Sequence, residues 1–236
     1  MCKRLIFILL IMNLTFFFGK KLVAQNMNGG GAGYFMLGGN IIKLENLNSE
    51  LEKNGYSKLE ENFFSLGGGG YGIIGKVIIG GEGHGLIGKE VTSGSYKTLI
   101  SAGYGFFNLG YIAYSNTNLN IYPLFGIGGG GISLRILEEG SLSFDEVLAN
   151  PKRGVELSKG SLLLNLAIGG DYLLGLKENE EAKGGFILGV RLGYTIAPIN
   201  GNWEMKGIEI SGGPDLGVTG PYIRIQFGGG GFGFKR

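Results

Sequence analysis

The fold is decided by the stretch Gly185-Phe186-Ile187-Leu188-Gly189-Val190-Arg191-Leu192-Gly193-Tyr194-Thr195-Ile196-Ala197-Pro198. Every second residue from Phe186 to Ile196 is large and apolar, whereas most of the residues between them are small or polar. Successive side chains of a β-strand point to opposite faces, so one face of this strand is apolar and the other carries glycine, threonine and arginine. The large residues would crowd a narrow barrel interior, whereas the small and polar ones fit it. The alternation therefore predicts a strand of a membrane barrel whose apolar face meets lipid.

The rest of the chain reads as further strands of the same kind. Eight are expected, at 31–43, 63–74, 76–88, 96–115, 119–137, 158–177, 185–198 and 221–234. Long connections at 44–62, 138–157 and 200–219 alternate with shorter ones. Outer-membrane barrels have an even number of strands, short turns at one end and longer loops at the other. The sequence thus predicts an all-β fold, a closed antiparallel eight-stranded transmembrane up-and-down barrel with short helical insertions in its long loops.

Two of the long connections contain helix signals. In the first, Leu44, Leu47, Leu51 and Leu59 could line one face of a short helix, with acidic residues between them. In the second, Ser143 is followed three residues later by Glu146, the pattern of a capping box. The sequence predicts a short helix at each place, the second ending before Pro151.

Glycine is the compositional outlier, with 49 of 236 residues. It occurs among Tyr, Phe, Ile and Leu, and 44% of the chain is hydrophobic, so we place the glycines inside strands. Runs of four occur at 67–70, 128–131 and 228–231. A phosphate-binding loop would need a following helix and a Gly-Lys-Ser/Thr ending, but strand-like sequence continues after each run. We expect these glycines to let the strands bend in a small barrel.

The N-terminus has the layout of a secretory signal peptide. Lys3 and Arg4 precede an apolar run over 5–18, and Val23-Ala24-Gln25 offers a cleavage point. The sequence therefore predicts a signal peptide at 1–25 and one barrel domain at 26–236. The alternative is a retained membrane anchor, but the run is shorter than the ~20 residues of a spanning helix. Cys2, the only cysteine, would leave with the signal, so no disulfide or cysteine metal site is expected.

The mature chain resembles the small outer-membrane β-barrels of the eight-stranded OmpA/OmpX-like class. The resemblance rests on the signal peptide, the loop alternation, the period-two strands and a last strand with aromatics at Phe227, Phe232 and Phe234. It implies a location in the outer membrane of a Gram-negative-type bacterium and contact with outer-membrane lipid. It also implies recognition by the barrel-assembly machinery, which reads a terminal aromatic. Lys235 and Arg236 follow Phe234 here, a departure from that terminal pattern.

Strand parity directs several polar side chains into the barrel. They are Glu82, His84, Asn165, Asp171, Arg191, Arg224 and Gln226. We interpret them as an interior ion network, with Glu82 and Asp171 against the two arginines, because buried charges must pair. The alternative is an acid/base or metal site at Glu82 and His84, but a metal needs three or four ligands and the chain has one histidine. No catalytic set, metal or cofactor is expected.

Aromatic residues suggest contacts at the barrel rims. Some of the tyrosines within or at the ends of strands are expected to form interfacial girdles, in preference to stacking on a ligand; the candidates are Tyr34, Tyr71, Tyr96, Tyr104, Tyr111, Tyr172, Tyr194 and Tyr222. Trp203, the only tryptophan, lies in the third long connection. It is a candidate contact for a partner, although packing of the loop onto the rim is the favoured interpretation.

The sequence favours a non-enzymatic outer-membrane barrel that is structural or mediates interactions through its long loops. An eight-stranded interior is just wide enough for side chains, so no open pore is expected. The net charge of +2, with scattered Lys and Arg, argues against nucleic-acid binding. The alternative is a soluble secreted or periplasmic barrel that binds an apolar ligand in the manner of lipocalins, with its apolar face inside. A third hypothesis is an enzyme acting on lipid, which requires a polar cluster on the lipid-facing side near one rim.

Overall fold

The computed structural model describes residues 27–116, 118–140, 143–149, 154–178 and 182–234, so the expected signal peptide lies outside the described residues. Eight long strands form the molecule: β1 (Met27–Ile41), β2 (Asn62–Ile74), β3 (Val77–Gly88), β5 (Tyr96–Tyr111), β7 (Leu119–Glu138), β8 (Gly154–Glu178), β9 (Ala182–Met205) and β11 (Gly220–Phe234). Each pairs antiparallel with its neighbours, and β11 pairs with β1. The predicted closed barrel is confirmed.

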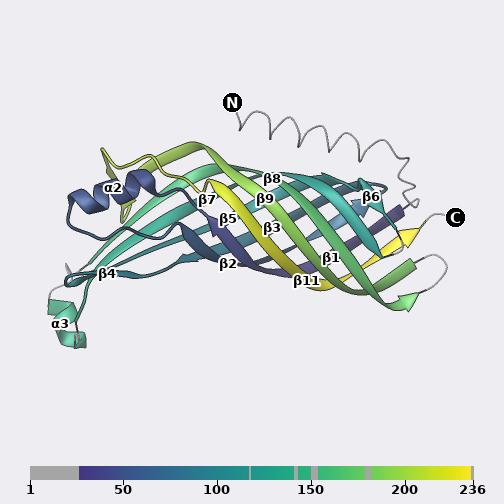
Figure 1. The fold of residues 1–236 in the computed structure, drawn as a ribbon, viewed down its shortest axis with the longest axis horizontal. Helices are drawn as coiled ribbons and strands as arrows, with labels where there is room; N and C mark the ends of the chain where they lie inside the picture. Colours follow the sequence, from purple (N-terminus) through teal and green to yellow (C-terminus); the bar gives the residue numbers. More distant parts are fainter. Residues whose placement is uncertain (1–26, 117, 141–142, 150–153, 179–181, 235–236) are drawn as a thin grey trace, which may run out of the picture.

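The connections add short elements. These are α2 (Glu45–Lys53), α3 (Phe144–Ala149), β4 (Val91–Ser93), β6 (Tyr114–Ser115) and β10 (Ile208–Ile210). Both predicted helices are confirmed, and they lie at the same end of the barrel (Figure 1). The strand expected at 96–115 ends earlier than predicted, at Tyr111, and residues 114–115 form the separate short strand β6, which pairs with β7. No helix in the described part of the chain is long and apolar enough to cross a membrane.

The connections between strands are longer at one end of the barrel than at the other, and among the described residues only the longer ones contain helices. We call the end with α2, α3, β4 and β10 the loop end and the end where β1 begins and β11 finishes the turn end (Figure 1). At the turn end β2 and β3 are joined by a tight turn in which Gly75 has a φ of 61°, a conformation suited to glycine. At the loop end β7, β8 and β9 extend farther than expected. The edges of the connections predicted at 138–157 and 200–219 therefore belong to the neighbouring strands. Trp203, for example, belongs to β9.

The wall has an apolar outer face and a more polar inner face. On β9 the side chains of Phe186, Leu188, Val190 and Leu192 are about half exposed. Arg191, between them, is 1% exposed and points inward. The same alternation continues around the ring, as the exposure pattern of β2, β3 and β7 shows. The predicted orientation is confirmed, and the outer surface is that of a membrane-spanning β-barrel.

The glycine runs follow this two-sided pattern. Each run lies inside a continuous strand, and none of its members has a positive φ. A Cβ at the inward Gly128 would collide with the carbonyl oxygen of Gly105, and one at Gly130 with Tyr104. A Cβ at the outward Gly129 would meet the carbonyl oxygen of Ser161 at 3.6 Å, an ordinary contact. The inward glycines thus make room for large side chains, a packing reason that the sequence alone did not suggest.

The interior is filled by two apolar clusters with a polar layer between them. Strand β3 shows the order: Ile78 belongs to the cluster at the turn end, Glu82 and His84 to the polar layer, and Leu86 to the cluster at the loop end. The cluster at the loop end includes side chains from outside the barrel wall, namely Leu44, Leu47, Leu51, Leu59, Leu216 and Val218. Helix α2 and its flanking loops therefore close this mouth of the barrel.

Candidate functional site

The polar layer is centred on the carboxylate of Glu82. Arg191 Nη1 donates a hydrogen bond to Glu82 Oε2, and Arg224 Nη1 donates to Oε1 at 3.2 Å. Both arginines and the glutamate are at most 1% exposed at their side chains. Since β3, β9 and β11 supply the three residues, the charges meet across the lumen. The structure brings Glu82 together with both predicted arginines.

His84 lies beside this ion pair and completes a short chain of polar contacts. Its Nε2 is 3.1 Å from Arg224 Nη1 and 3.5 Å from Glu82 Oε1. An arginine nitrogen only donates hydrogen bonds, so the contact with Arg224 requires Nε2 to accept. The ring proton is then assigned to Nδ1, which has no hydrogen-bond partner among the described residues. The ring also lies 5.4 Å from that of Tyr104.

Tyrosine rings surround the two guanidinium groups. Arg224 Cζ lies 3.6 Å from the ring centre of Tyr222 and 5.6 Å from that of Tyr104. Arg191 Cζ lies 5.4 Å from the ring centre of Tyr34. A cation over an aromatic face is stabilised by the ring quadrupole, and the effect is larger where water is excluded. These rings hold the arginines in place on the sides that the carboxylate does not cover.

Asp171 occupies a second part of the layer and corrects one expectation. It forms no ion pair with Arg191 or Arg224. Its Oδ2 accepts hydrogen bonds from Tyr71 at 2.5 Å and Tyr122 at 2.8 Å, and its Oδ1 accepts one from Gln226. The physical reason is position along the barrel axis: strand parity directs Asp171 inward, but the pairing register places it nearer the turn end than Glu82.

In this arrangement each charged side chain has at least one hydrogen-bond partner within the layer. Two arginines and two carboxylates balance in charge, and their hydrogen bonds run to one another, to tyrosine hydroxyls, to His84 and to Gln226. A buried charge left without a partner would be costly, so each member depends on the others. Among the described residues no group of three or more His, Cys, Asp or Glu side chains is placed to hold a metal ion.

Sequence reasoning missed most of the tyrosines in this layer. Four of the eight candidates for interfacial girdles are instead buried in the lumen, namely Tyr34, Tyr71, Tyr104 and Tyr222. Tyr122 joins them and donates to Asp171. The remaining tyrosines of that expectation are exposed on the outer face, namely Tyr96, Tyr111, Tyr172 and Tyr194. Tyr222 is two residues from Arg224 on the same strand, so their side chains point to the same face. The sequence alone could therefore have placed Tyr222 in the lumen.

The loop end has a second polar cluster, built around Trp203. The indole is 4% exposed, and its Nε1 donates to the carbonyl oxygen of Pro214 at 2.8 Å. Lys159 Nζ lies 5.9 Å from the ring centre and 3.1 Å from Asp215 Oδ1. The hydrogen bond from the Lys159 ammonium group lowers the pKa of the Asp215 carboxyl. Trp203 thus packs the 211–219 loop onto the rim, the favoured of its two interpretations.

Comparisons with known proteins give similarity at the level of solved structures. No protein family and no curated protein matches the sequence. The chain is similar to Ail, the attachment invasion locus protein of Yersinia pestis, with 13% identity and a TM-score of 0.39 over 89% of this chain and 99% of Ail. It is similar to the outer membrane protein OprG from Pseudomonas aeruginosa, with 14% identity and a TM-score of 0.33 over 90% and 98%. A third is the outer membrane protease OmpT from Escherichia coli, with 10% identity and a TM-score of 0.34 over 91% and 99%.

Proposed function

We propose that this protein is a non-enzymatic, non-conducting integral barrel of a bacterial outer membrane that mediates interactions through its loop end. The observation that carries the proposal is the filled lumen. Two apolar clusters and the polar layer between them occupy the interior, and α2 closes the mouth at the loop end. A barrel of eight strands has an interior that side chains can fill completely. What remains for contact with other molecules is the lipid-facing wall and the loop end.

The outer wall supports a position in lipid. Large apolar side chains are exposed on all eight long strands, and examples are Phe35, Phe64, Ile87, Phe107, Phe125, Leu166, Leu188 and Ile225. The ring closure leaves no free sheet edge along the barrel, as a bilayer requires. The lipocalin-like alternative needs the apolar face inside, the opposite of this orientation.

The polar side chains support a non-enzymatic role. The fold itself does not decide this, because one fold hosts unrelated functions. Glu82 is engaged by two arginines and Asp171 by two tyrosines and Gln226, so neither carboxylate is available as a general base. His84, the only histidine in the chain, lies in the same closed layer.

The loop between β7 and β8 supports an interaction role. Helix α3 begins at a capping box, in which Ser143 Oγ and its backbone nitrogen both contact Glu146 Oε2 at 2.8–2.9 Å. Its apolar side chains Phe144, Val147 and Leu148 are 76%, 44% and 65% exposed. Their i, i+3, i+4 spacing places them on one helical face, the form in which helices insert into apolar grooves of partners. An exposed apolar face at the tip of the molecule favours contact with a partner outside the cell.

Fractionation and conductance test this proposal together. We expect recovery in the outer membrane, a gel mobility that shifts on heating, and no discrete conductance steps when the folded protein is added to a planar bilayer. Recovery as a soluble, detergent-free monomer would contradict the membrane location. Reproducible conductance steps would contradict the filled lumen.

A further inference from the structure

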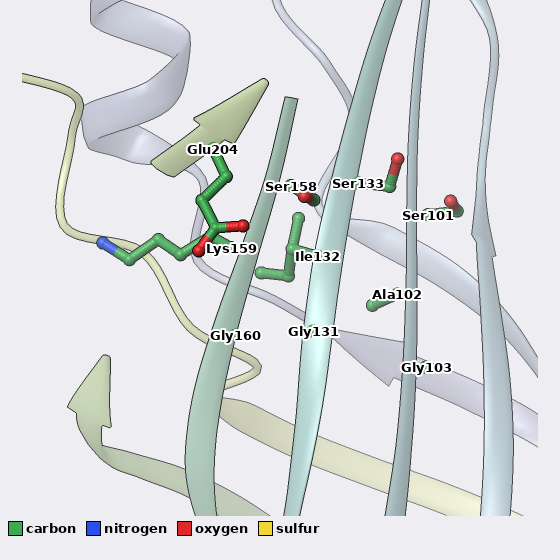
Figure 2. A pocket seen from close by; sticks show the side chains of 10 residues that line it. All are labelled: Ser101, Ala102, Gly103, Gly131, Ile132, Ser133, Ser158, Lys159, Gly160 and Glu204. Carbon is green, nitrogen blue, oxygen red and sulfur yellow. The ribbon is translucent and has the colours of Figure 1, made fainter. Parts of the chain in front are cut away.

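The outer wall carries a pocket of about 460 Å³ across β5, β7 and β8, near the loop end (Figure 2). Its upper lining is a row of polar residues that are direct cross-strand partners on four consecutive strands: Ser101, Ser133, Ser158 and Glu204. Its lower lining is a row of glycines one step nearer the middle of the wall: Gly103, Gly131 and Gly160. Figure 2 shows the serines side by side above the glycines. The pocket is therefore where the apolar wall changes to a polar one.

Several polar groups of this row have no partner within the described part of the chain. The hydroxyl of Ser133 contacts Glu156 Oε1 at 2.9 Å, whereas those of Ser101 and Ser158 form no hydrogen bond there. Glu204 forms no ion pair there, and Glu209 lies directly opposite it on β10. The pocket thus offers two free hydroxyl groups and, at one end, concentrated negative charge.

The lysine in the lining does not neutralise this charge. Lys159 extends away from the pocket in Figure 2, and its Nζ is bound by Asp215 at 3.1 Å. The next cross-strand pair toward the loop end on this outer face is Arg135 and Glu156, whose charged groups are 2.9 Å apart and satisfy each other. The free charge of the pocket is therefore anionic, and its complement is a cation.

The wall next to the pocket, toward the middle of the barrel, has a surface of glycines without side chains. Gly105 and Gly129 are outward cross-strand partners that continue the glycine surface toward the middle of the wall. Phe107 and Ile127, the next pair, are 53% and 48% exposed and border that surface. The apolar surface thus lies below a polar row that carries the hydroxyl groups and, at its β9 end, a carboxylate. A phospholipid presents the complementary order of acyl chain, phosphate and ammonium group.

We propose that this pocket binds one zwitterionic phospholipid with an ammonium-bearing headgroup. The hydroxyls of Ser101 and Ser158 donate hydrogen bonds to the phosphate oxygens, Glu204 pairs with the ammonium group, and an acyl chain lies over the glycines. The inference rests on the proposed membrane location. It also bears on the hypothesis of a lipid-acting enzyme, because the polar cluster which that hypothesis requires exists here. The carboxylate beside Ser133, that of Glu156, is paired with Arg135, and the only histidine, His84, points into the lumen.

Spin-labelled lipids test the proposal on the refolded full-length mature protein. The protein is placed in phosphatidylglycerol vesicles with nitroxide lipids that carry identical acyl chains and either a phosphoethanolamine or a phosphoglycerol headgroup. Electron paramagnetic resonance measures the fraction of each lipid that the barrel immobilises. We expect a preference for phosphoethanolamine that falls about two- to fivefold in Glu204→Gln, the range of an exposed ion pair. Ser101→Ala/Ser158→Ala should weaken binding of both headgroups.

A matched pair of glycine variants tests the acyl-chain track. Gly103→Leu fills the groove, and its Cβ would meet only the His84 carbonyl oxygen at 3.7 Å. Gly33→Leu makes the same change on β1, away from the groove, where a Cβ meets nothing within 4 Å. We expect Gly103→Leu to lose the phosphoethanolamine preference and Gly33→Leu to retain it.

The outcomes separate the inference from the proposed function. Equal immobilisation of both headgroups in the starting protein, or no change in Glu204→Gln and Gly103→Leu, would overturn the lipid site while leaving the membrane barrel intact. Absence of any immobilised lipid in every variant, together with no heat-shifted mobility, would instead show that the membrane location is wrong.

Discussion

The inner and outer faces of the barrel wall are built from the same strands, yet they give opposite roles to the same residue types. Gly128 faces inward and has no room for a Cβ, whereas its neighbour Gly129 faces outward and has room. Glu82 faces inward and binds two arginines that are almost completely buried, whereas Glu156 faces outward and binds Arg135 where both side chains are about half exposed. In a strand, one step along the sequence exchanges a closely packed surrounding for an open one. Tolerance to substitution should therefore alternate with residue number.

The largest difference in stability between inward and outward positions is expected when a charged side chain is neutralised. Glu82→Gln leaves Arg191 and Arg224 without their carboxylate, and breaking a buried pair costs about 3–5 kcal/mol of unfolding free energy. Glu156→Gln removes an exposed partner, which solvent screens, so its effect on stability should be far smaller. Urea unfolding followed by gel mobility without heating measures both. Equal unfolding midpoints for the two variants would show that the polar layer is not the closed network described above.

A smaller difference in stability between inward and outward positions is expected when a glycine is replaced by a larger residue. Gly128→Ala forces a Cβ against the backbone of β5, and overpacking of this kind costs about 1–3 kcal/mol. Gly129→Ala should change stability by no more than about 0.5 kcal/mol, as at other open surface positions. The unfolding midpoint can be read from the emission of Trp203, the only tryptophan. A destabilised Gly129→Ala beside an unaffected Gly128→Ala would mean that this strand has the opposite register.

The smallest effect is expected at the rim, where inside and outside meet. Because Lys159 lowers the pKa of Asp215 in the folded protein, the contact stabilises the loop fully above the ordinary aspartate pKa of about 4 and is lost as pH falls through the lower folded value. The emission of Trp203 should shift to longer wavelength over that acidic interval as the 211–219 loop loosens. Asp215→Asn should remove this pH dependence. A shift of the same size in Asp215→Asn would assign it to another group.

Much of the wall could be predicted from the sequence because the side-chain period of a strand is local. From the alternation alone, every second residue from Phe186 to Ile196 was predicted to face outward and Arg191 to face inward, and the structure confirms this. Ser143 and Glu146 likewise predicted α3, because a capping box spans four residues.

The partners inside the lumen could not be predicted, because they depend on distance along the barrel axis. Asp171 was paired with an arginine on parity, whereas its height is set by the register of seven other strands. Glycine-rich strands specify register weakly, since they have few side chains to fix it. Trp203 was placed in a loop for a related reason: β9 continues past Pro198 only because β8 and β10 lie beside it, and those pairings are not local.

The pairing of β1 with β11 has a consequence for biosynthesis. The first and last strands of the barrel, which are far apart in sequence, must bond to each other, from Gly29 opposite Gly233 to Asn40 opposite Tyr222. A folding barrel in which β1 and β11 have not yet paired therefore has two open sheet edges, and exposed edges are sites of aggregation. Transit of the unfolded chain to its membrane and the moment of closure are thus separate events. A chain truncated before residue 220 would lack β11 and could not close the sheet against β1.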